Sequence, residues 1–219
     1  VDAQTSITIA GNRDDFVSRG GHKLAGALDT FKEIKVEGKR CLDAGASTGG
    51  FTDVLLRRGA DCVVAADVGY GQLAWEIQQN PKVVILDRTN IRHLTGELVG
   101  DPIDLVVADL SFISLTLVLP ALAAVSKPEA DYVLMVKPQF EVGRERLGAG
   151  GVVRDPALRK AAVMEVAESA YDVGLGTLGV TASPLPGPAG NVEYFLWLRR
   201  GAPAIDEAAL DRAIEIGPQ

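Results

Sequence analysis

The sequence predicts an α/β domain with a mainly parallel, doubly wound sheet and helices on both faces. Apolar runs rich in Val, Leu and Ile recur along the chain, and stretches with a helical pattern separate them. Runs that are apolar at almost every position are typical of strands covered on both faces, and such strands are parallel with helical crossovers. The 219 residues, 47% of them apolar, suffice for one domain of this kind.

The apolar runs predict seven strands, because turn residues bound each run. We expect these strands at residues 40–44, 62–67, 83–86, 104–109, 131–137, 178–182 and 192–198. The last two are joined by the turn-rich segment SPLPGPAGN.

Helices are expected at residues 22–31, 50–58, 72–79, 155–173 and 206–216. The fourth has the clearest signals: Asp155 suits the N-cap, Pro156 the first helical position and Gly174 the residue after the end. Its apolar side chains recur every four residues, at Leu158, Ala162, Val166 and Ala170.

Charge and cysteine content narrow the function classes. The net charge of −7 argues against indiscriminate phosphate binding over the whole surface. Residues 137–160 nevertheless hold six basic and three acidic groups, so a local cationic site is as plausible as ordinary solvated charge. Cys41 and Cys62 each lie in an apolar run, which indicates core thiols and fits a reducing cytoplasm.

A membrane span and a signal peptide are not expected. The longest stretch without a charge covers residues 110–126, which is 17 residues, and it contains Pro120. A spanning helix needs about 20 apolar residues.

The segment DAGASTGG, residues 43–50, fits two chemistries. One is the G-x-S-x-G turn of serine hydrolases, which requires a histidine after the nucleophile and the acid. The chain has only His22 and His93, and neither lies where that histidine should be. The other is a cofactor loop, although the nicotinamide fingerprint would require glycine where the chain has Ser47.

S-adenosylmethionine (SAM) is the cofactor that remains. The first expected strand ends at Asp43, and the turn that begins at Gly45 lets the backbone approach the methionine part. Asp67, at the end of the second strand, is placed to accept hydrogen bonds from ribose hydroxyls. Asp87 ends the third strand, where it either binds the adenine or fixes its own loop.

The methyl acceptor is expected to be a sugar hydroxyl. Methylation of base amines typically uses an Asn or Asp followed by two prolines, whereas Asp109 is followed here by Leu110 and Ser111. A hydroxyl needs a base, and a lysine serves when desolvation or a neighbouring cation lowers its pKa. Lys137 ends the fifth expected strand, beside the strand of Asp109; the alternative is a lysine that only reaches solvent.

Six motifs closely resemble the TlyA, or haemolysin A, family of ribosomal RNA 2′-O-methyltransferases, relatives of the FtsJ (RrmJ) methyltransferase. They are FVSRGGHKL, LDAGASTGGFTDVLL, LDRTNIRHL, DLVVADLSFISL, VKPQFEVGRERLGAGGVVRD and SPLPGPAGNVEYFLWL, which together extend from residue 16 to residue 198. The resemblance implies a Rossmann-like class I SAM-dependent methyltransferase. It also implies a Lys-Asp-Lys-Glu tetrad, matched by Lys23, Asp109, Lys137 and Glu193.

In that tetrad, the resemblance implies that Lys137 is the base and Asp109 positions it. Lys23 and Glu193 are implied to set the local charge and hold the ribose. The turn and the resemblance together give the expected SAM contacts as Asp43, Gly45, Ser47, Thr48, Gly49, Phe51, Asp67, Asp87 and Asp109. Thr48 and Phe51 stand where FtsJ relatives often have proline and tryptophan, and no metal is required.

The resemblance implies ribosomal RNA or ribosomal subunits as partners, with cytidine as the target, and we expect a cytoplasmic monomer. Residues 1–17 are expected to be the remnant of an upstream S4-type RNA-binding domain and its linker, and residues 18–219 the methyltransferase domain. The basic, glycine-rich segment 141–153 is expected to be a mobile lid, or else an ordinary surface loop. RNA contacts are expected from Arg19, Arg144, Arg146 and Arg154.

Three alternatives remain open. They are a SAM methyltransferase with a non-RNA substrate, a SAM-binding module without catalysis, and a membrane-damaging protein, as the family's older name suggests.

Overall fold

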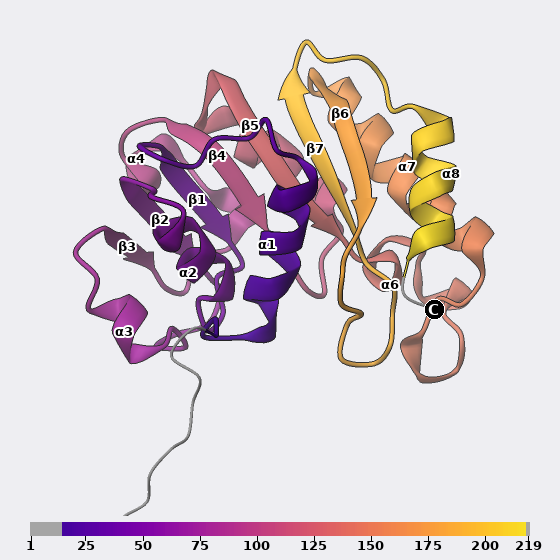
Figure 1. Ribbon diagram of the computed structural model, residues 1–219, viewed down its shortest axis with the longest axis horizontal. Helices are drawn as coiled ribbons and strands as arrows, with labels where there is room; N and C mark the ends of the chain where they lie inside the picture. Colours follow the sequence, from indigo (N-terminus) through magenta and orange to yellow (C-terminus); the bar gives the residue numbers. More distant parts are fainter. Residues whose placement is uncertain (1–14, 218–219) are drawn as a thin grey trace, which may run out of the picture.

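The fold is a seven-stranded sheet between two layers of helices (Figure 1). The computed structural model describes residues 15–217. The strands are β1 (Arg40–Ala44), β2 (Cys62–Ala66), β3 (Val83–Leu86), β4 (Ile103–Ala108), β5 (Ser126–Val136), β6 (Leu175–Ala182) and β7 (Tyr194–Arg200). Their order across the sheet is β3-β2-β1-β4-β5-β7-β6. Strands β1 to β5 pair in parallel, and β7 runs antiparallel to both of its neighbours.

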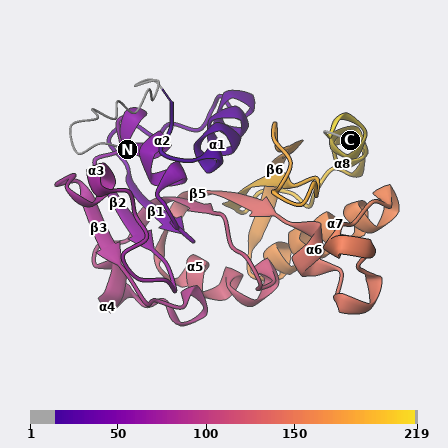
Figure 2. The same cartoon turned by 90° about the horizontal axis from the view of Figure 1, so that it is seen from below.

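Eight α-helices accompany the strands in the described part of the chain. They are α1 (Arg19–Thr30), α2 (Gly50–Arg57), α3 (Trp75–Gln78), α4 (Gly96–Val99), α5 (Leu119–Ala124), α6 (Pro138–Glu141), α7 (Pro156–Asp172) and α8 (Glu207–Ile216), counted within residues 15–217. Figure 2 shows α1 and α2 on one side of the sheet and α5 on the other. The layered α/β expectation is therefore confirmed.

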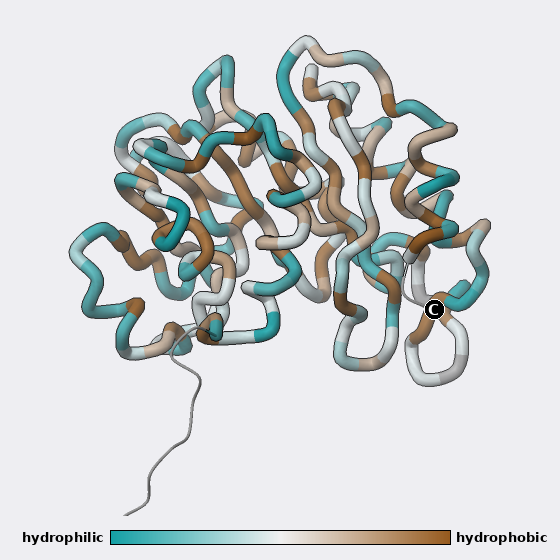
Figure 3. Tube along the Cα trace, in the orientation of Figure 1, coloured by the Kyte–Doolittle hydropathy of each residue, from teal (hydrophilic) through white to brown (hydrophobic). Residues whose placement is uncertain are grey.

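Alternation along each strand divides the core between the two faces. Cys41 and Val63 belong to the buried cluster that includes residues of α1 and α2, whereas Leu42 and Val64 belong to the cluster that includes residues of α5, α7 and α8. Because neighbouring side chains point to opposite faces, strands buried on both sides are apolar at nearly every position. The apolar residues follow the strands through the centre of the molecule, and hydrophilic residues dominate the outer loops (Figure 3).

Helix boundaries follow local capping and packing. Asp155 accepts a hydrogen bond from the Ala157 N–H at 2.9 Å, and Pro156 opens α7, as the sequence predicts. Helix α1 begins at Arg19, three residues before the expected start. Gly21 lies in this early part of the helix. A Cβ at this position would lie 2.4 Å from the Phe16 side chain, so only glycine fits there.

Three short helices, α4, α5 and α6, are absent from the sequence prediction. Each has four to six residues, which is too few to show a helical period. Pro120, which suggested a break in an apolar run, lies in the first turn of α5, where proline is tolerated. Helix α3 is limited to Trp75–Gln78, half the predicted length.

The carboxyl ends of β1, β2, β4 and β5 meet at one edge of the sheet, because these strands are parallel neighbours. Asp67, Asp109 and Lys137 each follow directly after one of these strands. Ligands bind at this edge in doubly wound folds.

The predicted upstream remnant, residues 1–17, lies mostly outside the described residues. Within residues 15–217, no helix combines the length and the apolar character needed to cross a bilayer.

Candidate active site

The glycine turn after β1 is shaped by two backbone constraints. Gly45 has φ +88°, and a Cβ there would lie 2.5 Å from the Asp109 carbonyl oxygen. Ser47, with φ 47°, also lies in the left-handed region. Its N–H donates to Asp67 Oδ2 at 2.9 Å, and the Gly69 N–H donates to Asp67 Oδ1 at 2.7 Å. Asp67 thus fixes the turn after β1 to the loop after β2.

A cavity of about 470 Å³ lies between this turn and the loop after β4. Of the predicted residues, Gly45, Ser47, Asp67 and Asp109 line it. Sequence reasoning missed its other walls, which are Val68, Gln72, Asn90, Ile91, Leu110, Ser111, Phe112 and Ile113. Phe112 is 91% exposed and has φ 63°, a strained conformation for an aromatic residue.

These residues fit SAM. The cavity volume lies in the range of small-molecule sites, roughly 300–1,000 Å³. Asp67 presents a carboxylate whose oxygens retain acceptor capacity for a ribose diol. Apolar side chains such as Ile91 and Leu110 suit an adenine ring, and Gly45 keeps the backbone side of the cavity open.

A second cavity, of about 440 Å³, joins the first through Gly45, Ser47, Asp109 and Ser111. It is lined by residues of α1, the glycine turn and the segment before β7. They are Ser18, Arg19, Gly20, Lys23, Gly45, Ala46, Ser47, Thr48, Gly50, Phe51, Asp109, Ser111, Lys137, Pro188 and Glu193. All four residues of the expected tetrad therefore face one cavity.

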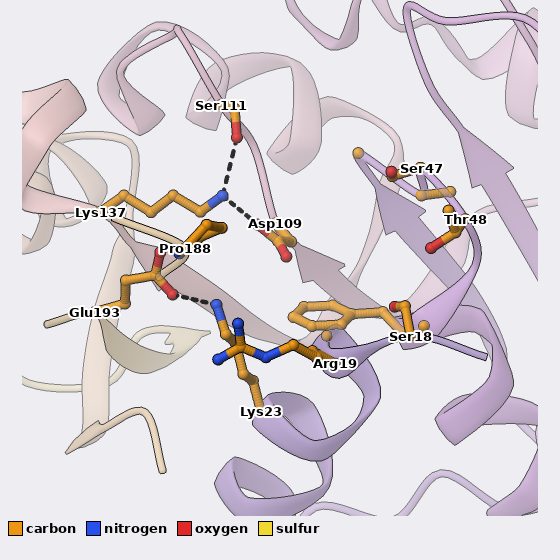
Figure 4. Close-up of a pocket in the computed structure, with 15 residues that line it drawn as sticks. Ser18, Arg19, Lys23, Ser47, Thr48, Asp109, Ser111, Lys137, Pro188 and Glu193 are labelled. Carbon is orange, nitrogen blue, oxygen red and sulfur yellow. Dashed lines mark hydrogen bonds and ion pairs between the residues drawn. The ribbon is translucent and has the colours of Figure 1, made fainter. Parts of the chain in front are cut away.

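The tetrad forms two ion pairs (Figure 4). Lys137 Nζ lies 2.5 Å from Asp109 Oδ1 and donates to Ser111 Oγ at 3.0 Å. Lys23 Nζ lies 2.6 Å from Glu193 Oε2. In Figure 4 the Lys137 amine points between Ser111 and Asp109.

The two ion pairs differ in how deeply they are buried. Lys23 is 6% exposed and Glu193 1% exposed, so each charge depends on the other for its neutralisation. Asp109 is half-buried, and it borders both cavities. In the Lys137–Asp109 pair, a reacting group can therefore reach Asp109 from either cavity and Lys137 from the second.

Comparison with known proteins identifies the family of this chain. The model of the FtsJ-like methyltransferase family matches residues 16–200. This chain belongs to the FtsJ-like methyltransferase family. The chain is 58% identical to the 16S/23S rRNA (cytidine-2′-O)-methyltransferase TlyA of Mycobacterium tuberculosis, over 98% of this chain and 82% of the relative.

Two solved structures are similar to this chain in fold. A protein from Streptococcus thermophilus, described as a "putative hemolysin", superposes with a TM-score of 0.88 at 38% identity, covering 94% of this chain and 75% of that one. A SAM-dependent methyltransferase from Mesorhizobium loti superposes with a TM-score of 0.59 at 17% identity, covering 80% of this chain and 96% of that one. The second likeness shows the fold alone. The fold is that of class I SAM-dependent methyltransferases, and SAM is the methyl donor that this FtsJ-like domain implies.

Some of the residues that were expected to contact SAM do not line the first cavity. Thr48 and Phe51 line only the second cavity. Asp87 lines neither cavity and accepts a hydrogen bond from the Gly71 N–H at 3.0 Å, which ties the loop after β3 to the loop after β2. Gly49, with φ +95°, lines neither cavity, and a Cβ there would press on Leu73 and Ile77.

Asp43 also lines neither cavity, because it lies beneath the glycine turn and is fully buried. Thr52 Oγ1 donates to its Oδ2 at 2.7 Å, and its Oδ1 has no hydrogen-bond partner among residues 15–217. Burial raises the pKa of this carboxyl to about 7, although the Thr52 hydrogen bond opposes the rise. Its carboxylate can act on a cofactor only through the turn above it.

The hydrolase interpretation finds no support in the geometry. The backbone of Ser47 is strained, as that of a hydrolase nucleophile is, but the histidine before it bonds elsewhere. His22 Nε2 lies 2.6 Å from Asp15 Oδ1 at the surface.

Burial raises the pKa of the Cys41 thiol to about 12, which agrees with a core thiol.

The predicted RNA-binding arginines are divided between two places. Arg19 begins α1 at the mouth of the second cavity, where it donates to the Pro186 carbonyl at 3.4 Å. Arg146 and Arg154 are exposed in and after the segment 141–153. Arg146 Nε donates to the Val142 carbonyl at 2.6 Å. The side chain of Arg144 lies outside the described part of the chain.

The segment 141–153 is anchored at both ends. Val142 and Val153 are buried against Ala162 of α7. Asn191 accepts from the Val153 N–H at 2.9 Å and donates to the Gly151 carbonyl at 3.0 Å. The segment is thereby tied to the loop that leads to Glu193. Across residues 15–217, no cluster of three or more His, Cys, Asp or Glu is placed to hold a metal ion.

Proposed function

We propose that this chain methylates the ribose 2′-hydroxyl of a cytidine in ribosomal RNA, with Lys137 as the general base. The observation that supports the proposal most directly is the position of the Lys137–Asp109 pair. It lies where the SAM-compatible cavity meets the second cavity. The name of the Mycobacterium tuberculosis relative supplies the acceptor class.

In this proposal, the neutral amine of Lys137 takes the hydroxyl proton and becomes an ammonium ion. Asp109, at 2.5 Å, stabilises that ammonium and holds the lysine in place. When bound, SAM supplies a methyl group on a positively charged sulfur that leaves as a neutral thioether. Because this donor is already activated, the protein contributes mainly positioning, worth roughly 7–11 kcal/mol, and proton removal.

The buried pair shapes the second cavity for a ribose. Lys23 and Glu193 hold fixed, opposite charges on its wall, and they can donate to and accept from sugar hydroxyls. Arg19 at the mouth is placed for a backbone phosphate. These are contacts to sugar and phosphate, which fits a reaction at the ribose.

We further propose that the chain acts as a monomer on ribosomal subunits in the cytoplasm. The segment 141–153 serves as a lid whose arginines contact RNA phosphate. Its buried ends at Val142 and Val153 serve as the hinges of this movement.

The test is transfer of tritiated methyl from SAM to unmodified ribosomal subunits, followed by alkaline hydrolysis of the RNA. A 2′-O-methyl group blocks cleavage at its own phosphodiester, so we expect the label in alkali-resistant dinucleotides that contain cytidine. Label released in mononucleotides, or label in protein, would rule out the ribose. Stable binding of SAM with no transfer to subunits, RNA or protein would instead indicate a binding module.

A further inference from the structure

We infer that Ser111 is a positioning residue that aims the lone pair of Lys137 at the substrate hydroxyl. This inference rests on the proposed function, because it assumes that Lys137 is the base. Ser111 stands outside the Lys-Asp-Lys-Glu tetrad. It lines both cavities, as Asp109 does.

The geometry of an amine gives Ser111 its role. A neutral lysine amine has two N–H bonds and one lone pair, arranged tetrahedrally with the bond to Cε. Ser111 Oγ, at 3.0 Å, accepts a hydrogen bond from Lys137 Nζ, whereas Asp109 Oδ1, at 2.5 Å, makes an ion-pair contact without hydrogen-bond geometry (Figure 4). The hydrogen bond to Ser111 engages one N–H bond, and the charge of Asp109 attracts the other, which leaves the lone pair turned away from both. Without Ser111, no hydrogen bond within the described part of the chain would hold the amine against rotation about its bond to Cε.

The surroundings of Lys137 leave few other acceptors. Its side chain is 11% exposed. Its Nζ lies 5.9 Å from the centre of the Phe140 ring, on the side of its own helix α6. Ser111 itself is exposed toward the cavities, so it is open to the substrate as well as to the lysine.

The loop that holds Ser111 is coupled to the segment that holds Lys137. Glu141, one helical turn after Lys137, accepts from the Leu115 N–H at 3.0 Å and from Ser114 Oγ at 2.5 Å. Two contacts from one carboxylate thus fix the loop after β4 against the start of α6. The distance between the serine and the lysine is set by this connection as well as by the sheet.

Proton transfer preserves the arrangement. The ammonium ion formed on Lys137 has three N–H bonds. Two stay with Asp109 and Ser111, and the third points at the oxygen that lost the proton. No bond to the protein has to break, so the reorganisation cost is small.

The experiment compares Ser111→Ala, Ser111→Thr and Lys137→Ala for methyl transfer to ribosomal subunits. It measures kcat, KM for SAM and for subunits, and the pH dependence of kcat, and it checks SAM affinity by calorimetry. For Ser111→Ala we expect kcat to fall roughly tenfold, the value of one hydrogen bond to a charged group. We expect both KM values to change less than about threefold, because binding precedes proton removal.

Two further readouts distinguish positioning from a structural role. Loss of an acceptor disfavours the ammonium form, so the acid limb of the kcat profile of Ser111→Ala should move to lower pH. Ser111→Thr keeps the hydroxyl and should restore kcat to within about threefold of the wild type. A kcat loss that threonine does not rescue, with an unmoved acid limb, would overturn the inference.

The outcomes separate this inference from the proposed function. If Lys137→Ala abolishes transfer while Ser111→Ala matches the wild type in kcat and pH profile, Ser111 has no positioning role and the lysine base stands. If Lys137→Ala retains transfer, the lysine base fails and the inference about Ser111 fails with it.

Discussion

At the scale of single residues, the buried pair of Lys23 and Glu193 is the costliest feature of the site. Two charges that are 6% and 1% exposed have lost nearly all contact with water. Such pairs seldom stabilise a fold relative to apolar side chains, because desolvation offsets their attraction. Their presence in the second cavity is therefore best explained by the substrate.

Removing one partner and then both tests this explanation. We expect Lys23→Met to lower the free energy of unfolding by about 3–5 kcal/mol, because Glu193 is left with an uncompensated buried charge. The double variant Lys23→Met/Glu193→Leu should recover most of that loss in urea unfolding. It should remain inactive in methyl transfer, and recovery of activity with stability would refute a catalytic role for the pair.

Asp43 predicts a pH dependence of stability. Its pKa is raised to about 7 in the folded state from 3.8, mainly by burial. Between these two values the folded carboxyl keeps a proton that the unfolded one loses, so the free energy of unfolding falls as pH rises. One pKa unit corresponds to about 1.4 kcal/mol. Above pH 7 the folded carboxyl is ionised as well, and the loss in the free energy of unfolding is complete.

Asp43→Asn should remove that penalty while its amide oxygen still accepts from Thr52. We expect the variant to exceed the wild type in stability by up to a few kcal/mol at about pH 8, with the difference vanishing near pH 4. Urea titrations at both pH values check this. A gain of equal size at both would show that ionisation of Asp43 is not its source.

At the scale of elements, the turn between β1 and α2 depends on glycine for two separable reasons. Gly45 has φ +88°, and its missing Cβ would meet the Asp109 carbonyl oxygen at 2.5 Å. Gly71, in the loop after β2, serves as the comparison. It has φ +63°, and nothing lies within 4 Å of the position that a Cβ would take, so Gly71→Ala measures the cost of the left-handed conformation alone.

We expect Gly71→Ala to cost about 1–2 kcal/mol of stability, which is the penalty for the left-handed region. Gly45→Ala should cost more and should weaken SAM affinity at least tenfold, because the turn must move away from the loop after β4. Thermal unfolding and calorimetric titration with SAM measure the two effects. Equal SAM affinities for the two variants would contradict the proposed cofactor cavity.

The apolar runs along the chain show which elements the sequence could predict. The apolar runs located all seven strands, and β1 and β3 match their expected bounds. The acids and the lysine that follow the parallel strands could be predicted to share one edge, because topology alone brings them together. Lys23 and Glu193 come from a helix and from the segment before an antiparallel strand, so only the family resemblance indicated them.

The remaining site residues left no local signal. Asn90, Ile91 and Ser111 lie between strands, in segments whose paths depend on tertiary contacts such as that of Glu141 with Leu115. Asp43 and Gly49 belong to the glycine motif and were predicted to contact SAM, yet they face the interior. A motif shows which residues form a turn, whereas the direction of each side chain depends on what packs behind it.

At the scale of the whole molecule, an acidic chain is proposed to bind a polyanion. The net charge is −7, so attraction to RNA must come from a local set of cations. Each phosphate contact releases counterions and steepens the dependence of affinity on salt. The salt dependence of RNA binding therefore counts the contacts.

Arg146 and Lys160 give a matched comparison. Arg146 is exposed on the proposed lid, whereas Lys160 Nζ lies 2.6 Å from Asp211 Oδ1 between α7 and α8. We expect Arg146→Ala to reduce the slope of log affinity against log salt by roughly 0.7–0.9, the value of one phosphate contact. Lys160→Ala should leave it unchanged. Fluorescence anisotropy with ribosomal RNA at several salt concentrations measures both, and an unchanged slope for Arg146→Ala would contradict the lid proposal.

The central claim, that Lys137 removes the ribose proton, is tested most directly by Lys137→Ala. SAM affinity from calorimetry and methyl transfer to unmodified ribosomal subunits are measured on the same preparation. We predict SAM affinity within about threefold of the wild type and transfer reduced at least 10²-fold, the usual contribution of a general base. Transfer close to the wild-type rate would contradict the claim.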